Sequence, residues 1–161
     1  MTSQELDERI ANLPPRYEHR TIPTEAEDHL HDECGIFGIF GSPEAAKHIY
    51  LGLYALQHRG QEGGGIVCAH EGVLSAHRGL GLVVDIFKPH KLARVQGTHG
   101  IGHVRYSTTG DSNLKNVQPL AVDYAKGSMA IAHNGNLVNY ETLREELEGS
   151  GAIFQSTTDS E

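Results

Sequence analysis

The sequence predicts an α+β domain built from short strands that are joined by tight turns. Gly occurs 19 times among 161 residues, Trp is absent and 38% of the residues are hydrophobic, a mixture more typical of short strands than of a helical bundle. Short apolar runs bounded by Gly, Pro and Asn alternate with stretches of helical periodicity. The length suits one domain with a substantial core.

Residues 1–33 are predicted to be a leader rather than a folded part of the domain. They carry nine Asp/Glu and three Arg, and so most of the net charge of −8. Pro14, Pro15 and Pro23 interrupt helical structure, and apolar residues are sparse. A short frayed helix ending near Leu13 is the one element we expect. The segment is either a disordered tail or a propeptide that is removed.

Composition excludes several classes of protein. The N-terminus lacks the apolar core of a secretory signal, and no run of about 18 apolar residues suggests a membrane span. No basic patch is present to neutralise the phosphates of a nucleic acid. The two cysteines, Cys34 and Cys68, are therefore expected to be reduced thiols in a cytoplasmic protein.

The first half of the domain is predicted to be strand, helix and hairpin. Residues 34–40 read as a buried strand, and Ser42-Pro43 is a typical helix start. That helix is expected to run to about Gln57. Its apolar face consists of Ala46, Ile49, Tyr50, Leu53 and Leu56. Strands at 66–70 and 73–77 are expected to be joined by a turn at Glu71-Gly72.

The second half is predicted from weaker patterns. Helical turns are expected on either side of Pro89, in 79–87 and 91–95. The other predicted elements are a strand at 98–106, a buried strand at 128–133, a helix at 140–148 capped by Asn139 with Leu143 and Leu147 on one side, and a strand at 152–154.

Cys34 is the candidate nucleophile. A cysteine attacks as its thiolate and needs a base, which is either a His side chain or the amine at the start of a chain. Cys34 stands where the polar segment ends and the strand begins, so it would be the first residue if the leader were removed. A buried structural cysteine is the alternative interpretation. Cys68 lies inside an apolar run and is expected to be a core residue.

Polar residues at predicted strand ends complete the candidate site. Asn134 and the Gly135 N–H could hold an oxyanion, although Asn-Gly is also a common turn. Arg105 could bind a carboxylate through two N–H groups, or it could form a surface salt bridge. Asp159 could pair with an ammonium group or cap a helix. To bind an amino acid, a site needs one cationic side chain for the carboxylate and one anionic side chain for the ammonium group, and this chain offers one candidate for each.

We predict no metal site in this chain. The pattern His29-x-His31-x-x-Cys34 offers too few ligands for structural zinc, and no second cluster accompanies it. Neither a P-loop nor a dinucleotide-binding glycine motif is present.

Together these residues resemble the class II (N-terminal nucleophile) glutamine amidotransferase family. The resemblance covers residues 34–161. The segments that carry it are Cys34-Gly35-Ile36-Phe37-Gly38, Leu56-Gln57-His58-Arg59-Gly60-Gln61-Glu62, Gly102-His103-Val104-Arg105-Tyr106-Ser107-Thr108, Ala132-His133-Asn134-Gly135-Asn136-Leu137 and Thr158-Asp159-Ser160-Glu161. His58 and Tyr106 favour the branch that uses phosphoribosyl pyrophosphate (PRPP) over the branch that aminates fructose 6-phosphate.

The resemblance implies a four-layer αββα sandwich and a role for each site residue. Cys34 would be both nucleophile and, through its α-amine, the base. The other implied roles are an oxyanion hole from Asn134 and Gly135, a carboxylate site from Arg105 and Thr108, an ammonium site at Asp159, and Arg59 beside the nucleophile. Gly63-Gly64-Gly65 replaces the usual Ser-Ala-Gly and is expected to loosen its loop.

The resemblance also implies parts that this chain does not contain. The chain ends without a closing element, so we expect a longer polypeptide with a phosphoribosyltransferase domain that uses glutamine and PRPP in purine synthesis. Mg²⁺ and a 4Fe-4S cluster would belong to that part, and the whole enzyme is expected to be a homo-oligomer. The alternatives are a glucosamine-6-phosphate synthase or glutamate synthase type of amidotransferase, and a non-catalytic binding module.

Overall fold

The computed structural model describes residues 2–13, 34–106 and 113–161. The chain forms two compact units, Met1–Asp32 and Glu33–Glu161. Most of the predicted leader, residues 14–33, and the predicted site residue Thr108 lie outside the described residues.

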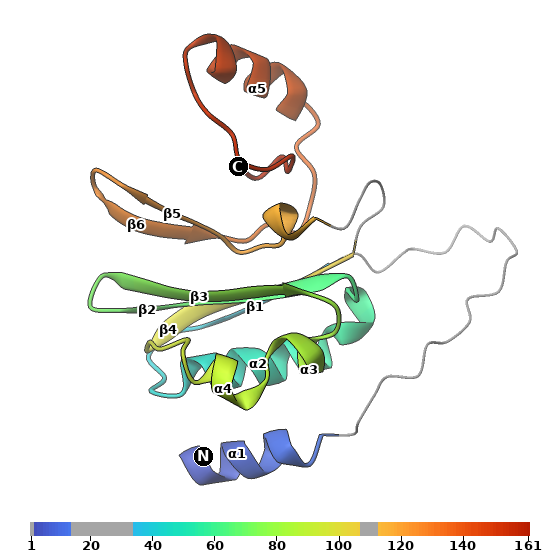
Figure 1. Cartoon of the computed structure of the whole chain (residues 1–161), viewed down its shortest axis with the longest axis vertical. Helices are drawn as coiled ribbons and strands as arrows, with labels where there is room; N and C mark the ends of the chain where they lie inside the picture. The colour runs from blue at the N-terminus through green and yellow to red at the C-terminus, as the bar shows by residue number, and fades with distance from the viewer. Residues whose placement is uncertain (1, 14–33, 107–112) are drawn as a thin grey trace, which may run out of the picture. The chain divides into compact units, whose positions relative to one another are not determined.

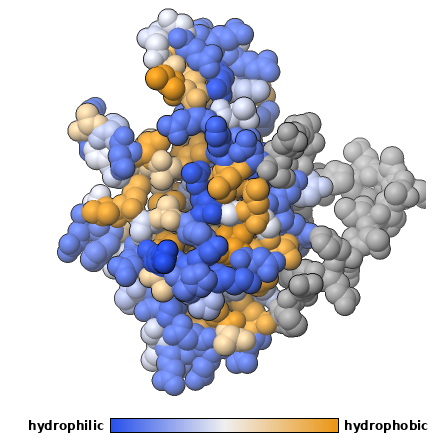
Figure 2. Space-filling model, viewed as in Figure 1, coloured by the Kyte–Doolittle hydropathy of each residue, from blue (hydrophilic) through white to orange (hydrophobic). Residues whose placement is uncertain are grey.

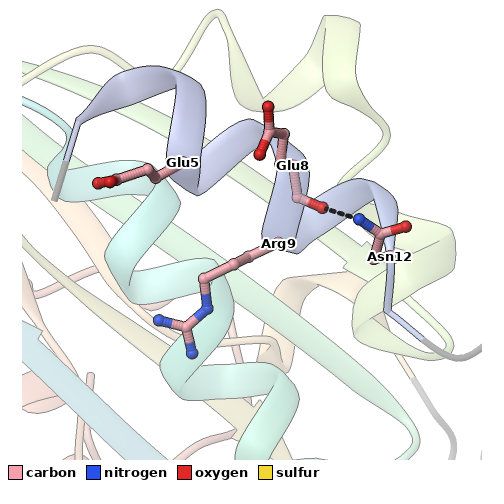
Figure 3. A pocket seen from close by; sticks show the side chains of 4 residues that line it. All are labelled: Glu5, Glu8, Arg9 and Asn12. Atoms are coloured by element: carbon pink, nitrogen blue, oxygen red, sulfur yellow. Dashed lines mark hydrogen bonds between the residues drawn. The ribbon is translucent and has the colours of Figure 1, made fainter.

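In the first unit, residues 2–13 contain one helix, α1 (Ser3–Ala11). Thr2 and Glu5 form a capping box: the Thr2 Oγ1 accepts the Glu5 N–H at 3.2 Å, and the Glu5 Oε2 accepts the Thr2 N–H at 2.7 Å. The Asn12 Nδ2 donates to the Glu8 carbonyl at 2.8 Å at the other end. Glu5, Glu8, Arg9 and Asn12 line a hollow along α1 (Figure 3). The predicted short helix is therefore confirmed.

The second unit is layered, with helices on one face of a sheet and a hairpin on the other (Figure 1). The strands are β1 (Gly35–Ile39), β2 (Gly63–His70), β3 (Val73–Leu80), β4 (His99–Arg105), β5 (Leu120–Tyr124) and β6 (Gly127–Ile131). The helices are α2 (Ala45–Ala55), α3 (Val83–Ile86), α4 (Pro89–Leu92) and α5 (Tyr140–Gly149), with short 3₁₀ turns η1 (Gln57–Arg59) and η2 (Leu114–Asn116).

The larger sheet has four strands in the order β1-β4-β2-β3, and all neighbours are antiparallel. β5 and β6 form a separate antiparallel pair beyond it, and α5 follows β6 (Figure 1). The predicted α+β class, with layers in the order helix, sheet, sheet, helix, is confirmed.

The core lies between α2 and the four-stranded sheet. Ile49 and Leu53 of α2 are fully buried, and they pack against Gly102 of β4, where a Cβ would lie 2.4 Å from Ile49 Cγ2. Close packing of this kind requires glycine on the strand. The predicted apolar face of α2 is therefore confirmed, although the helix begins at Ala45. Ser42 accepts the Glu44 N–H at 3.3 Å in the preceding turn.

β2 and β3 form the predicted hairpin, but both strands are longer than predicted. Glu71 and Gly72 have φ angles of +49° and +80°, the left-handed pair that a tight two-residue hairpin turn requires. The prediction of a loosened loop at Gly63-Gly64-Gly65 is wrong. All three residues are buried in β2, and Gly65 lets the carbonyl of Gln118 approach the strand.

Other expectations fail where tertiary packing decides exposure. The end of the first predicted strand is exposed, with Phe40 86% accessible. β6 is mostly exposed because a two-stranded ribbon has few neighbours to cover it. Apolar residues therefore remain on the surface (Figure 2), among them Val122, Tyr124, Met129 and Ile131 on the hairpin and Leu143 and Leu147 on α5. Residues 152–154 do not form a strand, and Asn139 precedes α5 without a side-chain capping bond.

We predict that Gly65→Ala lowers the free energy of unfolding by about 1–3 kcal/mol, the usual cost of overpacking. A Cβ there would lie 2.4 Å from the Gln118 carbonyl oxygen and 2.9 Å from Pro119 Cδ. Gly38→Ala is the matched control in β1, because its nearest neighbour would be 3.6 Å away. Urea denaturation measures both, and equal effects would contradict the close approach.

Candidate functional site

The candidate nucleophile lies directly before β1, at the end of the neighbouring strand β4. The pairing of Gly35 with Val104 brings the residue before β1 next to the last residues of β4. The Cys34 Sγ is 3.4 Å from the Tyr106 nitrogen, which donates to it, and 3.5 Å from the Tyr106 carbonyl oxygen. Cys34 has a φ of +53°, a left-handed conformation that is unfavourable for a non-glycine residue.

Arg59 contacts Cys34 from the turn that follows α2. Its Nε donates to the Cys34 carbonyl at 2.7 Å. The turn is held by buried Gln57, whose Oε1 accepts the Val83 N–H at 2.6 Å and whose Nε2 donates to the Gly60 carbonyl. The predicted position of Arg59 beside the nucleophile therefore agrees with the structure.

Arg105 is the last residue of β4 and belongs to the same cluster. Its Nη1 is buried and has no hydrogen-bond partner among the described residues. A buried guanidinium N–H without an acceptor is costly, and a carboxylate is the acceptor that satisfies it best. The position of Arg105 therefore fits the binding of an anion close to Cys34.

Asp159 belongs to a second cluster, around the loop between β6 and α5. One carboxylate oxygen accepts the Leu137 N–H at 2.7 Å and lies 3.9 Å from His133 Nδ1, and the other accepts the Ser160 hydroxyl at 3.1 Å. Only 13% of the Asp159 side chain is exposed. A single carboxylate in this setting can accept an ammonium group.

Asn134 and Gly135 lie in the same loop and are exposed. The His133 ring passes beneath Gly135, where a Cβ would lie 2.6 Å from its Nε2. The described contacts tie this loop to Asp159, through His133 and Leu137. The structure therefore forms two clusters, one with Cys34, Arg59 and Arg105 and one with Asn134, Gly135 and Asp159.

His103 lies between the two clusters and was not predicted as a site residue. It is 1% exposed, and its two ring nitrogens have no hydrogen-bond partner in the parts of the chain that the structure describes. Burial lowers its pKa from 6.5 to about 4, and the Arg105 charge adds to this, while the nearby His133 backbone opposes it. Its position two residues before Arg105, on the same face of β4, could have identified it.

The two cysteines differ in their surroundings. Both are reduced, but Cys68 is fully buried in β2 whereas Cys34 is partly accessible. Burial raises the pKa of the Cys68 thiol to about 11, so that it stays protonated and unreactive near neutral pH. The expectation that Cys68 is a core residue is confirmed.

The described ranges 2–13, 34–106 and 113–161 contain no cluster of three or more His, Cys, Asp or Glu residues suited to a metal ion. Within the same ranges, no helix has both the length and the apolar character needed to cross a bilayer.

Buried, neutral His103 makes stability depend on pH. Between pH 6.5 and about 4 the unfolded chain binds a proton at this residue and the folded chain does not. The free energy of unfolding therefore falls as the pH is lowered, by about 2–3 kcal/mol at pH 4.5. We predict that His103→Leu removes this part of the fall, as measured by urea denaturation at pH 7 and 4.5. Replacement of exposed His70 by Leu is the control, and an equal effect of both would contradict the account.

Comparisons with known proteins identify the family of this chain. Residues 89–161 match the family model described as a glutamine amidotransferase domain. The chain is 56% identical over 131 residues to a chloroplastic amidophosphoribosyltransferase of Glycine max, covering 81% of this chain and 23% of that protein. It is 50% identical over 133 residues to an amidophosphoribosyltransferase of Staphylococcus aureus, covering 82% of this chain and 27% of that protein.

Solved structures give the same result. The allosteric regulatory enzyme of purine biosynthesis superposes with a TM-score of 0.75 at 49% identity, over 78% of this chain and 27% of that one. The glutamine PRPP amidotransferase of Bacillus subtilis, complexed with ADP and GMP, gives 0.72 at 49% identity, over 77% and 27%. This chain thus spans about a quarter of the length of its relatives. It belongs to the glutamine amidotransferase family and corresponds to part of an amidophosphoribosyltransferase.

Proposed function

We propose that residues 34–161 hydrolyse glutamine to glutamate and ammonia, with Cys34 as the nucleophile. The observation that carries this proposal is the pairing of β1 with β4, which brings the Cys34 thiol against Tyr106 and next to Arg105. A candidate nucleophile and a buried guanidinium nitrogen that has no hydrogen-bond partner among the described residues thereby share one end of a sheet. That combination suits an amino-acid substrate, which is held by its carboxylate while its side chain reaches the sulfur.

The reaction needs one proton acceptor and one oxyanion site. The α-amine of Cys34 accepts the thiol proton, the sulfur attacks the carboxamide carbon of glutamine, and the proton is passed to the departing ammonia. Asn134 and the Gly135 N–H stabilise the tetrahedral oxyanion, at about 3 kcal/mol for each donor. Water then hydrolyses the γ-glutamyl thioester, which releases glutamate and regenerates the thiol.

The remaining residues hold the substrate. Arg105, with Thr108, binds the α-carboxylate of glutamine, and Asp159 binds its α-ammonium group. Arg59 orders the backbone at Cys34 through its hydrogen bond to the Cys34 carbonyl. The largely buried carboxylate of Asp159 supports its role, because an ion pair gains strength where water is excluded.

Activity further requires that residues 1–33 be removed as a propeptide. While Glu33 is joined to Cys34, the nitrogen of Cys34 is an amide and cannot accept a proton at neutral pH. The precursor is therefore inert in this scheme, and processing switches the enzyme on.

In the whole protein we propose that the ammonia converts PRPP to 5-phosphoribosylamine, the first committed step of purine biosynthesis. The names of the relatives support this over a glucosamine-6-phosphate or glutamate synthase. Mg²⁺ and any 4Fe-4S cluster belong outside this chain, whose two cysteines are too few to hold a cluster. We further propose a cytoplasmic homo-oligomer, although the Glycine max relative is named chloroplastic.

The test uses the full-length polypeptide, assayed with glutamine and, separately, with ammonia plus PRPP. We predict that Cys34→Ala lowers glutamine hydrolysis about a thousandfold or more, because it removes the nucleophile, while ammonia-dependent synthesis persists. Cys68→Ala is the matched control and retains both activities. Undiminished glutamine hydrolysis by Cys34→Ala would refute the proposal, and loss of both activities would indicate that Cys34 serves folding instead.

A further inference from the structure

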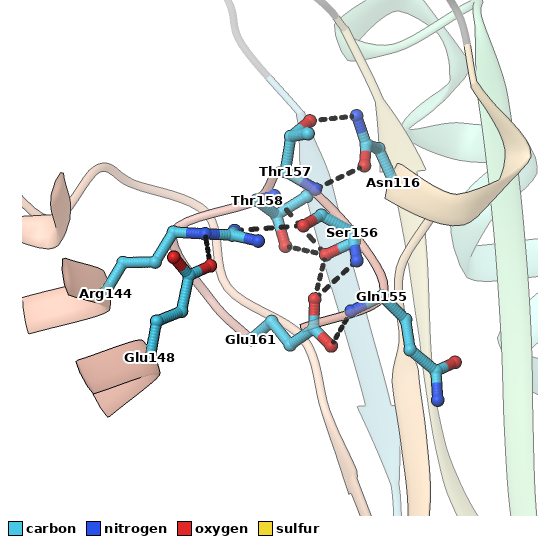
Figure 4. A network of polar contacts seen from close by, with 8 residues as sticks. All are labelled: Asn116, Arg144, Glu148, Gln155, Ser156, Thr157, Thr158 and Glu161. Carbon is cyan, nitrogen blue, oxygen red and sulfur yellow. Dashed lines mark hydrogen bonds and ion pairs between the residues drawn. The ribbon is translucent and has the colours of Figure 1, made fainter. Parts of the chain in front are cut away.

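Asp159 lies on an irregular segment, residues 150–161, that contains no strand or regular helix. The segment folds on itself and onto α5. The Glu161 carboxylate accepts the N–H groups of Gln155 and Ser156 at 2.7 and 2.6 Å, and Arg144 donates to the Ser156 carbonyl at 3.0 Å (Figure 4). These contacts shape the segment, but they do not connect it to the sheet that carries Arg105.

That connection comes from residues 113–119, which run over the other face of the four-stranded sheet. Asn116 makes two hydrogen bonds to Thr157: its Nδ2 donates to Thr157 Oγ1 at 2.8 Å, and its Oδ1 accepts the Thr157 N–H at 3.1 Å (Figure 4). Gln118 donates from Nε2 to the Ser160 hydroxyl at 3.4 Å. Asp159 is thus flanked by two residues that are held from the same short segment.

The amide of Gln118 also holds the candidate oxyanion loop. Its Oε1 accepts the His133 N–H at 2.6 Å, immediately before Asn134 and Gly135. Gln118 is 8% exposed, so both bonds lie in a largely dry environment where a lost partner is costly. One amide therefore fixes two parts of the site at once, the residue next to Asp159 and the residue before Asn134.

The same segment is anchored firmly to the sheet. Arg78 of β3 donates from Nη1 to the Val117 carbonyl at 2.9 Å, and the Val117 side chain is fully buried. Gly65 of β2 has no Cβ, which lets the Gln118 backbone lie directly on the strand. Through their hydrogen bonds to Thr157 and Ser160, Asn116 and Gln118 therefore connect the four-stranded sheet to the segment that carries Asp159.

We propose that Asn116 and Gln118 are positioning residues that set Asp159 at the correct distance from Arg105 and so make the site selective for amides that carry an α-ammonium group. The proposal rests on the proposed function. Because the contacts of Glu161 and Arg144 keep the segment folded, loss of the Asn116 contacts shifts Asp159 without unfolding its surroundings.

The test compares glutamine hydrolysis by variants of the full-length polypeptide. Asn116→Ala is expected to raise the KM for glutamine about tenfold with kcat nearly unchanged, the effect of losing well-placed hydrogen bonds. Gln118→Leu is expected both to raise KM and to lower kcat, because it also releases the residue before Asn134. Asn116→Asp keeps the acceptor for the Thr157 N–H and should restore part of the loss. Asn113→Ala is the matched control, since its side chain accepts only the Lys115 N–H among its described contacts, at 3.0 Å.

A double-mutant comparison separates positioning from general structure. In an Asp159→Asn background, Asn116→Ala should cause little further loss, because the residue through which it acts is already changed. Glutaramate, which has the carboxylate and the amide but no amine, should be hydrolysed equally by wild type and Asn116→Ala. The proposal is overturned, while the proposed function stands, if Asn116→Ala still raises KM tenfold in the Asp159→Asn background. It is overturned likewise if the KM of Asn116→Ala equals that of Asn113→Ala. A wild-type enzyme that does not hydrolyse glutamine overturns both.

Discussion

The antiparallel pairing of β1 with β4 is the constraint on which the rest of the site depends. It starts at Gly35 opposite Val104, so the residue before β1 and the residues that end β4 must lie together. A shift of this pairing by one residue would turn the Arg105 side chain toward α2 and away from the β5–β6 layer, since side chains alternate along a strand. The register is fixed by close packing, because Gly102 and Val104 face α2 where little free space remains.

The second constraint is the short distance between the four-stranded sheet and the segment above it. Gly65 has no side chain and so leaves room for the Gln118 backbone, and Arg78 donates a hydrogen bond to the Val117 carbonyl. Residues 117–119 therefore lie directly on β2 and β3. Asp159 and the candidate oxyanion loop are held through this segment rather than by the four-stranded sheet itself. One cluster therefore contains the candidate nucleophile and Arg105, and the other contains Asp159 with Asn134 and Gly135.

Local features of the sequence predicted much of the fold. The apolar spacing of α2 and the turn at Glu71-Gly72 depend on neighbours in the chain, and both were identified correctly. The prediction for Gly63-Gly64-Gly65 is wrong because glycine is required at Gly65 by the close approach of the Gln118 carbonyl, which is distant in the sequence. Exposure of β6 was missed as well, since an apolar strand does not reveal how many layers cover it.

In the candidate site, too, the residues recognisable from the sequence differ from those that depend on distant contacts. Cys34, Arg105 and Asp159 stand out because their residue types suggest a chemistry and they adjoin predicted strand ends, whereas the role of Arg59 is implied only by the family resemblance. Asn116 and Gln118 carry no such signal, because their partners Thr157 and Ser160 are 41 and 42 residues away. His103 carries only a weak signal, its place two residues before Arg105 on the same face of β4, because the burial that sets it apart from the other histidines is not visible in the sequence.

The central claim is that the amine and the thiol of one residue perform the hydrolysis together. Intact-mass analysis with N-terminal sequencing of the purified, glutamine-hydrolysing protein tests it most directly. The account predicts a chain whose first residue is Cys34, with its amine free. An active chain in which Glu33 remains joined to Cys34 would contradict it.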